Sequence, residues 1–453
     1  MKLYKFVFLF LFSGMLFTSC AEDEDDIIDD EVGQPGPDRN LDVENFMYNG
    51  MNEIYLYKAD VPELADNYFA NQQERNEWLS EFEDPEDLFY NGLTASFDRF
   101  SFMTDDYVAL EQSFQGTSTT TGMNYAIGRI NGGNDLFGAV RYVLPGTSAE
   151  EEGLERGMVF TKIDGQQLTV SNYQSLLAQS NFTIHLADIN NDGAIAETGE
   201  TVSLSKAEYT ANPVYIAKTL NVDGLKVGYL MYNSFTADFD AQMNQAFAEF
   251  KAEGIDELVL DLRYNGGGNV ETAVDLSSMI TGQFEGEIFS KQQWNATYQN
   301  YFEREDAERL VDRFNDKIRT GDLINSLNLT KVYIIATGSS ASASELVING
   351  LDAYIDVVHV GTTTVGKFQA SITLYDSSNF GRQNANPNHK YAIQPLVYKS
   401  ANAIGTTDYI NGLTPDIDQQ EYVRSYGVLG DESEPLLAAA LADITGNRFM
   451  LQE

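Results

Sequence analysis

The second half of this chain alternates short apolar segments with amphipathic ones, and this alternation limits its possible folds more than any other feature. The apolar runs lie at 227–231, 257–262, 332–336 and 357–360. The segment 239–253 lies between the first two runs. Its apolar residues Met243, Phe247 and Phe250 share one helical face. Nearly continuous apolar strands separated by helices are typical of a mostly parallel sheet that helices cover on both faces. We therefore expect an α/β domain over residues 211–453.

Two regions of different character precede this domain. Residues 41–116 have apolar positions three and four apart, such as Met47, Met51 and Ile54, which predicts a helical N-terminal domain. Within it, Asp84 followed by Pro85 is typical of a helix start. Residues 117–210 contain short β-runs and turns instead. A chain of 453 residues is long enough for several domains, so we expect a multidomain α+β protein.

The β-rich region has the order of elements found in PDZ domains. An apolar strand at 139–144 leads through Pro145-Gly146 to a short helix, a second strand at 158–163 and an Asp-Gly hairpin. This order resembles the PDZ family, whose members add an extended peptide to a strand edge and hold its C-terminal carboxylate with backbone N–H groups of a loop. Here that loop would be Ala126-Ile127-Gly128. The alternative is a PDZ-like domain that only gates or spaces the other domains.

The N-terminus has the features of an export signal. Lys2 and Lys5 precede an apolar run at 6–17, which is shorter than the ~20 residues of a membrane-spanning helix. Small residues then lead into Cys20, and this pattern resembles the bacterial lipoprotein signal, in which residues 1–19 are removed and Cys20 is lipidated. Ordinary secretion with an incidental cysteine is the alternative. Residues 20–40 are acidic and then rich in Gly and Pro, which predicts a solvated tether. We expect a lipid-anchored protein of the bacterial outer membrane, on its periplasmic face or on the cell surface.

The charge balance excludes one class of partner. The net charge is −41 at pH 7, and phosphate binding needs clustered Lys and Arg, so nucleic acid is not an expected partner. Cys20 is the one cysteine of the chain, so no intramolecular disulfide can form.

The segment 188–193 resembles the start of a calcium-binding loop, but the acid that would close the loop, Glu200, comes one position late. We expect a β-hairpin turn there, and no metal or cofactor.

A serine-rich turn before an apolar helix is the clearest candidate for a chemical site. Residues 338–345 read Gly-Ser-Ser-Ala-Ser-Ala-Ser-Glu. Ser342 and Glu345 fit a capping box, so a well-capped helix would explain the turn by itself. A serine at a helix N-terminus is also where local N–H groups and the helix dipole would stabilise an oxyanion. Both interpretations, helix cap and nucleophile, remain open at this point.

A lysine is the candidate base for such a serine. The chain has three histidines, and neither His359, in an apolar strand, nor His389, in a loop, has a convincing acid partner in the sequence. A lysine base must be neutral, so its pKa must fall by about three units from ~10.4, which burial can achieve. Lys367 follows an uncharged stretch and meets this requirement. A rival Ser-x-x-Lys pattern at 203–206 alternates like a strand, whereas its chemistry would need a helix.

Three glycines follow the strand that ends at Asp261. Gly266, Gly267 and Gly268 allow backbone N–H groups to approach a ligand closely. The run lacks the Lys-Ser/Thr of a P-loop and the spaced glycines of a dinucleotide site. An oxyanion-binding loop therefore fits better than a phosphate loop.

Together these motifs resemble the C-terminal processing (tail-specific) peptidases. The resemblance covers about residues 45–445, and its motifs are Asp261-Leu262-Arg263-x-Asn265-x-Gly267-Gly268, Ser-Ala-Ser-Ala-Ser-Glu at 340–345, Gly366-Lys367, Leu413-x-Pro415-Asp416 and Leu429-Gly430-Asp431. It implies a ClpP/crotonase-like catalytic core with Ser342 as nucleophile and Lys367 as general base. It also implies an oxyanion hole formed by the N–H groups of Ala343 and a glycine of the 266–268 run, with Gly267 as the first choice.

The lysine motif departs from the family pattern. The family usually has glycine after the lysine and glutamine four residues after it, whereas Phe368-Gln369-Ala370-Ser371 stands here. Gln369 and Ser371 are therefore both candidates for a third polar member of the site. The resemblance implies a serine endopeptidase that cleaves protein or peptide substrates through an acyl-enzyme, with the PDZ domain recognising or gating C-terminal segments. The altered lysine motif leaves one alternative, a catalytically silent peptide-binding or scaffolding lipoprotein on the same fold.

Overall fold

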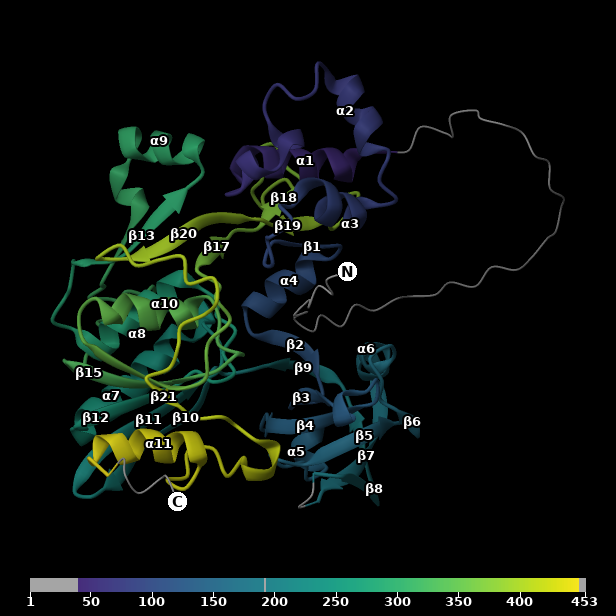
Figure 1. The fold of residues 1–453 in the computed structure, drawn as a ribbon. Coiled ribbons are helices and arrows are strands. Elements are labelled where there is room, and N and C mark those ends of the chain that lie inside the picture. Colours follow the sequence, from purple (N-terminus) through teal and green to yellow (C-terminus); the bar gives the residue numbers. More distant parts are fainter. Residues whose placement is uncertain (1–39, 191–192, 448–453) are drawn as a thin grey trace. The chain divides into compact units, whose positions relative to one another are not determined.

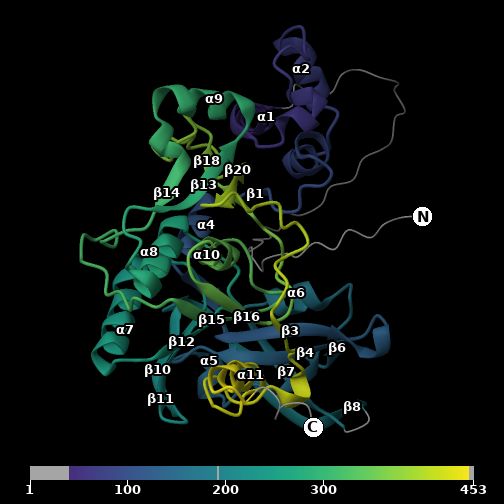
Figure 2. The same cartoon turned by 60° about the vertical axis from the view of Figure 1, so that its left-hand side comes forward.

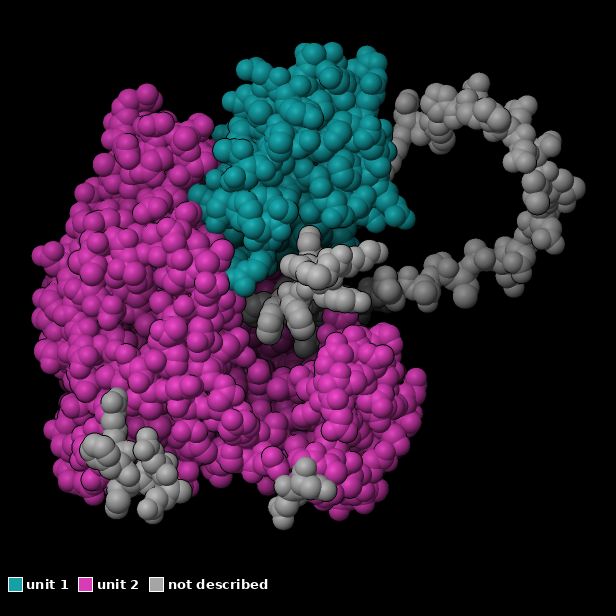
Figure 3. Space-filling model, viewed as in Figure 1, with its two compact units in different colours: residues 1–107, 372–396 teal, residues 108–371, 397–453 magenta. Residues whose placement is uncertain are grey.

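The computed structural model describes residues 40–190 and 193–447. The chain divides into two compact units, one of residues 1–107 with 372–396 and one of residues 108–371 with 397–453 (Figure 3). The predicted signal peptide, Cys20 and all but the last residue of the predicted tether lie outside the described residues. Within the described ranges, no helix is both long enough and apolar enough to cross a membrane.

The first unit consists mainly of helices. Its helical segments are α1 (Asp42–Ile54), α2 (Gln72–Leu79), α3 (Pro85–Asp87) and a π-helical turn, η3 (Leu88–Leu93). Met47 and Met51 of α1 are fully buried. The Asp84 side chain accepts a hydrogen bond from the Asp87 N–H, and Pro85 is the first helical residue, so the predicted helix start is confirmed.

A small sheet completes this unit. Strands β1 (Phe102–Thr104), β19 (Ala392–Gln394) and β18 (Leu374–Tyr375) pair antiparallel in that order. The segment 372–396 therefore packs with the N-terminal residues, although the sequence had assigned it to the α/β domain. The cause is strand pairing between positions about 290 residues apart, such as Phe102 with Gln394, which no local pattern reveals.

The second unit begins with α4 (Tyr107–Phe114) and then forms a β-rich part. This part has an antiparallel sheet. Its strands, in spatial order, are β3 (Met123–Arg129), β4 (Leu136–Val143), β5 (Val159–Ile163), β7 (Asn181–Ile189) and β8 (Ile195–Ser205), and β6 (Gln166–Gln167) pairs with β5. The β-rich part also contains two short helices, α5 (Ser148–Glu151) and α6 (Tyr173–Ala178), and a separate pair of strands, β2 (Thr117–Thr120) and β9 (Ala207–Thr210). Strands β7 and β8 pair antiparallel as far as Ile189 with Ile195, which agrees with the hairpin expected at 188–193; residues 191–192 of that segment lie outside the described residues. The rival serines Ser203 and Ser205 lie in β8, which is a strand and not a helix.

The rest of the second unit, from β10 onwards, contains the predicted parallel sheet. Its strands, in spatial order, are β10 (Val214–Val222), β11 (Leu225–Tyr232), β12 (Glu257–Asp261), β15 (Lys331–Ala336), β16 (Asp356–Gly361) and β21 (Ile417–Asp418). All neighbours from β11 onwards are parallel, and β10 is antiparallel to β11.

Helices cover both faces of this sheet (Figures 1 and 2). Helices α7 (Asp240–Glu253), α8 (Val270–Thr281) and α10 (Ala343–Asp352) pack on one face, and α11 (Pro435–Ile444) packs on the other. Alternate residues of β12 enter the two cores: Leu258 and Leu260 pack with α7, α8 and α10, whereas Val259 packs with α11. The prediction of a sheet covered on both faces is therefore confirmed.

A second, smaller sheet adjoins this part of the unit. Its strands run in the order β14 (Val311–Arg313), β13 (Ile288–Trp294), β20 (Leu396–Asn402) and β17 (Gln369–Ser371), and α9 (Ala296–Glu305) connects β13 to β14. Strand β17 begins two residues after Lys367, so this sheet helps to fix the turn that carries the lysine.

Candidate active site

The three turns with predicted site residues follow three neighbouring parallel strands. The glycine-rich loop follows β12, the serine turn follows β15, and the lysine turn follows β16, with β15 between the other two. The carboxyl ends of parallel strands lie at one edge of a sheet, which is where open α/β sheets bind ligands. The fold therefore brings together turns that are far apart in the sequence.

Ser342 differs from the neighbouring serines in backbone conformation and exposure. It precedes α10 with φ 57° and ψ −114°, a left-handed conformation that none of the other serines of the turn adopts. Ser340 and Ser344 are fully buried, and their Oγ atoms donate to the carbonyls of Leu262 (2.7 Å) and Asn265 (2.9 Å). Ser342 is only partly buried. A strained non-glycine residue in a strand-to-helix turn is typical of a nucleophile held at a functional site.

The carboxylate of Glu345 joins the serine turn to the lysine turn. Its Oε2 accepts hydrogen bonds from the backbone N–H groups of Ser342 (2.9 Å) and Lys367 (2.8 Å). Its Oε1 accepts from the N–H of Gly366 (2.6 Å) and from the hydroxyl of Thr364 (2.5 Å). Burial raises the pKa of the Glu345 carboxyl, and these four donors oppose that shift. The bond to the Ser342 N–H is the part of the capping box that Glu345 supplies, as the sequence predicted.

The glycine-rich loop packs directly on the serine turn. At Gly267, where φ is +104°, an added Cβ would lie 2.7 Å from Ser342 Cβ and 2.8 Å from the Ala341 carbonyl oxygen. The Gly267 N–H donates to Asn265 Oδ1 (2.8 Å), so this predicted oxyanion donor is engaged within its own loop. The Asn265 side chain in turn donates to the Tyr232 carbonyl (2.9 Å), which anchors the loop to the end of β11.

The N–H of Ala343, the other predicted oxyanion donor, differs from the N–H of Gly267. Ala343 is the first residue of α10, and in the described ranges its N–H has no hydrogen-bond acceptor. Such a donor at a helix N-terminus, beside Gly267 and next to Ser342, can stabilise developing negative charge by donating a hydrogen bond to it.

The remaining predicted site residues lie on the lysine turn and on β17, the strand that follows it. Lys367 is partly buried, and its backbone is fixed through Glu345. Gln369 is buried at the start of β17, and Ser371 is partly buried at its end.

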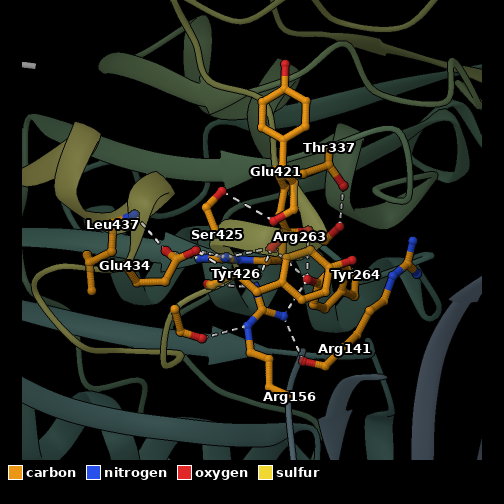
Figure 4. Close-up of polar contacts among 12 residues, drawn as sticks. Arg141, Arg156, Arg263, Tyr264, Thr337, Glu421, Ser425, Tyr426, Glu434 and Leu437 are labelled. Carbon is orange, nitrogen blue, oxygen red and sulfur yellow. Dashed lines mark hydrogen bonds and ion pairs between the residues drawn. The ribbon is translucent and has the colours of Figure 1, made fainter. Parts of the chain in front are cut away.

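A network of buried charged side chains lies at the start of the glycine-rich loop, around Arg263. Arg263 is fully buried and contacts Asp261 (2.7 Å), Glu434 (2.6 Å) and Glu421 (3.0 Å) (Figure 4). Burial by itself would raise the pKa of Glu421, but the nearby guanidinium groups of Arg263 and Arg156 outweigh it and hold this pKa below its ordinary value. Loss of Arg263 from this network would leave three carboxylates close together without the guanidinium that they share.

The β-rich part contacts both the network and the serine turn. Arg156 reaches Glu421 (2.5 Å) and the Tyr264 hydroxyl (2.7 Å), and Figure 4 shows it lying among these groups. Arg141 of β4 donates to Ser339 Oγ (3.1 Å), and its guanidinium lies 4.7 Å from the centre of the Tyr264 ring. These contacts join residues between 108 and 265 positions apart, which no local pattern reveals, so sequence reasoning missed these residues.

The predicted carboxylate-binding loop is a strand. Ala126, Ile127 and Gly128 lie within β3 and pair with residues 137–139 of β4. The prediction of a loop was wrong because Tyr125 and Ile127 pack on the core of the β-rich part and hold the segment in the sheet. However, β3 is an edge strand of its sheet, so these residues do lie along a sheet edge.

The three histidines have other contacts. His359 of β16 is buried, its Nε2 lies 3.2 Å from the Ala336 carbonyl, and burial lowers the pKa of its imidazole. His185 accepts the Gly165 N–H (3.0 Å). His389, in the first unit, contacts Asp376 (3.0 Å), an acid partner that the sequence had not indicated.

A strained serine beside a glycine-rich loop, at the carboxyl edge of a parallel sheet, defines a serine hydrolase of the α/β class. Residues 226–418 match peptidase family S41, and residues 42–102 match the peptidase S41 N-terminal domain; together the two matches cover more than half of the chain. The chain belongs to peptidase family S41 and is a serine-type peptidase, so the predicted family is confirmed.

Relatives and solved structures agree with this assignment. The chain is 24% identical over 402 residues to a chloroplastic C-terminal processing peptidase of Tetradesmus obliquus, covering 85% of this chain and 76% of that protein. It is 23% identical over 391 residues to the carboxy-terminal processing protease CtpB of Bacillus subtilis, covering 83% and 70%. The structure of a putative S41 protease from Bacteroides fragilis superposes with a TM-score of 0.69 at 26% identity, over 92% of this chain and 99% of that one. The structure of the photosystem II D1 C-terminal processing protease shares the fold. It superposes with a TM-score of 0.53 at 20% identity, over 88% of this chain and 100% of that one.

Proposed function

We propose that this chain is an endopeptidase of the bacterial envelope in which Ser342 attacks the substrate carbonyl and Lys367 is the general base. One observation carries the proposal: a single carboxylate oxygen of Glu345 accepts the N–H groups of both Ser342 and Lys367. The two residues are therefore on turns that are fixed next to each other. The fully buried serines of the same turn, Ser340 and Ser344, donate their hydroxyl protons to backbone carbonyls instead.

The proposed reaction proceeds through an acyl-enzyme. The neutral Lys367 amine takes the proton of Ser342 Oγ as this oxygen bonds to the peptide carbonyl carbon. The protonated lysine then gives that proton to the leaving amine as the peptide bond breaks. In the second step the same lysine takes a proton from the water that attacks the ester carbonyl, and it returns this proton to Ser342 Oγ as the ester bond breaks. In this proposal Gln369 or Ser371 orients the lysine.

The N–H of Ala343 would stabilise the oxyanion together with a donor from the 266–268 run. Loss of one such donor typically lowers kcat by about 10²–10³-fold. Gly267 would serve as the second donor only after releasing Asn265 Oδ1, because its N–H is engaged there.

The β-rich part, residues 117–210, is proposed as a PDZ-like domain that recognises or gates the C-terminal segments of substrates. The support is that Ala126, Ile127 and Gly128 lie in an edge strand, where an extended peptide can add as a further strand. The proposed chain order is signal peptide (1–19), tether (20–40), helical domain (41–116), PDZ-like domain and peptidase core (211–453). Lipidation of Cys20 would attach the protein to the outer membrane, and radiolabelled palmitate should label the expressed full chain but not its Cys20→Ser variant.

Cleavage of casein by the purified full chain tests the proposed pair. Ser342→Ala and Lys367→Ala should each lower the rate by at least about 10³-fold. Ser339→Ala and Lys331→Ala are matched controls, since Ser339 lies in the same turn and Lys331 in the adjacent strand β15, and both should keep activity. Full activity in Ser342→Ala or in Lys367→Ala would refute the assignment of that residue.

A further inference from the structure

We propose that Glu345 is a positioning residue that sets the spacing between nucleophile and base, an inference that rests on the proposed Ser342–Lys367 pair. An ordinary capping residue needs only to accept the N–H of the N-cap residue. Glu345 accepts that hydrogen bond from Ser342 and three more, all from the lysine turn at 364–367. Its contacts therefore exceed what a helix cap requires.

The contacts of Glu345 reach the reacting residues themselves. The two turns are also joined by the Val365 N–H, which donates to the Ser340 carbonyl (3.1 Å), but that bond includes neither Ser342 nor Lys367. The shared Oε2 holds the backbone nitrogens of both residues within 2.9 Å of one atom. A shift of either turn must therefore break or stretch a hydrogen bond to a charged acceptor, and such bonds are stronger than those between neutral groups.

Full burial makes this arrangement depend on all its donors. Glu345 is 0% exposed, and a carboxylate without water must obtain its hydrogen bonds from the protein. Four donors on two oxygens use the acceptor sites of the group. Thr364 is itself held, because its hydroxyl oxygen accepts the Leu413 N–H (2.8 Å).

Two substitutions of Glu345 remove different parts of the arrangement. In Glu345→Gln the amide oxygen can replace Oε2 and keep both backbone contacts, while the amide NH₂ faces Thr364, whose hydroxyl can turn to accept. The Gly366 N–H and the Thr364 hydroxyl proton then lose the acceptor that Oε1 provides. Glu345→Ala removes all four bonds and releases the two turns from each other.

Steady-state hydrolysis of a fluorogenic peptide by the purified full chain tests the inference, together with the rate at which a fluorophosphonate labels Ser342. We expect kcat and labelling rate to fall by about 10²-fold in Glu345→Ala, the loss typical of a misplacement near 1 Å, with KM within about threefold of the wild type. In Glu345→Gln we expect a smaller fall, of about tenfold, because only the contacts of Oε1 are lost and both backbone contacts of Oε2 remain. Asn349→Ala is the matched control: Asn349 is buried on the same helix and donates to the Thr406 carbonyl, away from both turns.

The outcomes separate this inference from the proposed function. If Glu345→Ala folds and has the kcat and labelling rate of Asn349→Ala, Glu345 is only a structural cap and the inference is wrong. If Glu345→Ala does not fold, Glu345→Gln decides, and a wild-type kcat in that variant overturns the inference. If Ser342→Ala or Lys367→Ala keeps full activity, the proposed pair itself fails, whatever the Glu345 variants do.

Discussion

Replacement of Gly267 by alanine should impair catalysis through a steric effect whose size the structure gives. The added Cβ would lie 2.7 Å from Ser342 Cβ and 2.8 Å from the Ala341 carbonyl oxygen, whereas ordinary contacts begin at 3.4 Å. The glycine-rich loop or the serine turn must therefore move by roughly 0.7 Å. A displacement of about 1 Å in a catalytic group can cost about 10²-fold in rate, so we expect kcat to fall between about tenfold and 10²-fold.

The control for this variant must share its backbone strain without its contacts. Gly405 has a similar φ of +95°, and no atom lies within 4 Å of a Cβ built there. Gly405→Ala and Gly267→Ala should both lose about 1–2 kcal/mol of stability from the left-handed backbone, measured by urea unfolding. Only Gly267→Ala should lose kcat in a peptide assay. If Gly267→Ala keeps a kcat within about twofold of Gly405→Ala, the serine turn does not need its observed position and the reasoning fails.

Two further predictions concern stability. Burial raises the pKa of Asp275 to about 7, whereas its pKa in the unfolded chain is about 3.9. The folded state therefore binds the Asp275 proton more tightly than the unfolded state does. The stability that this proton contributes is full below about pH 4 and is lost as the pH rises through 7. Asp275→Asn should therefore be more stable than the wild type at pH 8, by at most about 4 kcal/mol, but hardly at pH 4; an equal difference in urea unfolding at both pH values would contradict this. Glu434→Ala should lower the free energy of unfolding by about 3–5 kcal/mol because it leaves the buried Arg263 without its bidentate partner, and a urea-unfolding loss below about 1 kcal/mol would show that the network rearranges.

The parts of the site that sequence reasoning found depend on local patterns. The apolar runs located β12, β15 and β16, and each candidate turn was recognised because it directly follows one of these strands. The spacing of Ser342 and Glu345 predicted their hydrogen bond, because a capping box is a local structure.

The parts that sequence reasoning missed depend on contacts between distant segments. The same carboxylate of Glu345 binds residues about 20 positions later, and nothing in its own neighbourhood shows this. Arg156 and Glu421, 265 residues apart, meet for the same reason. At Ala126-Ile127-Gly128 the error came from assigning a loop by resemblance where side-chain packing and the pairing partner β4 favour a strand.

The sequence left open whether Ser342 is a helix cap or a nucleophile, and its backbone conformation bears on this question. An ordinary N-cap serine has an extended backbone, which costs little, and accepts a helix N–H with its side chain. Ser342 makes both contacts of a capping box with Glu345, but it has φ 57° and ψ −114°, a conformation that costs about 1–3 kcal/mol for a residue with a side chain. Capping alone gives no reason for this cost, since an extended serine would cap the helix without it. The surrounding structure nevertheless enforces the conformation, with Gly267 packed against the side chain and Glu345 bound to the N–H. A helix cap does not need such enforcement, whereas the proposed nucleophile would need it to present its hydroxyl at a fixed position.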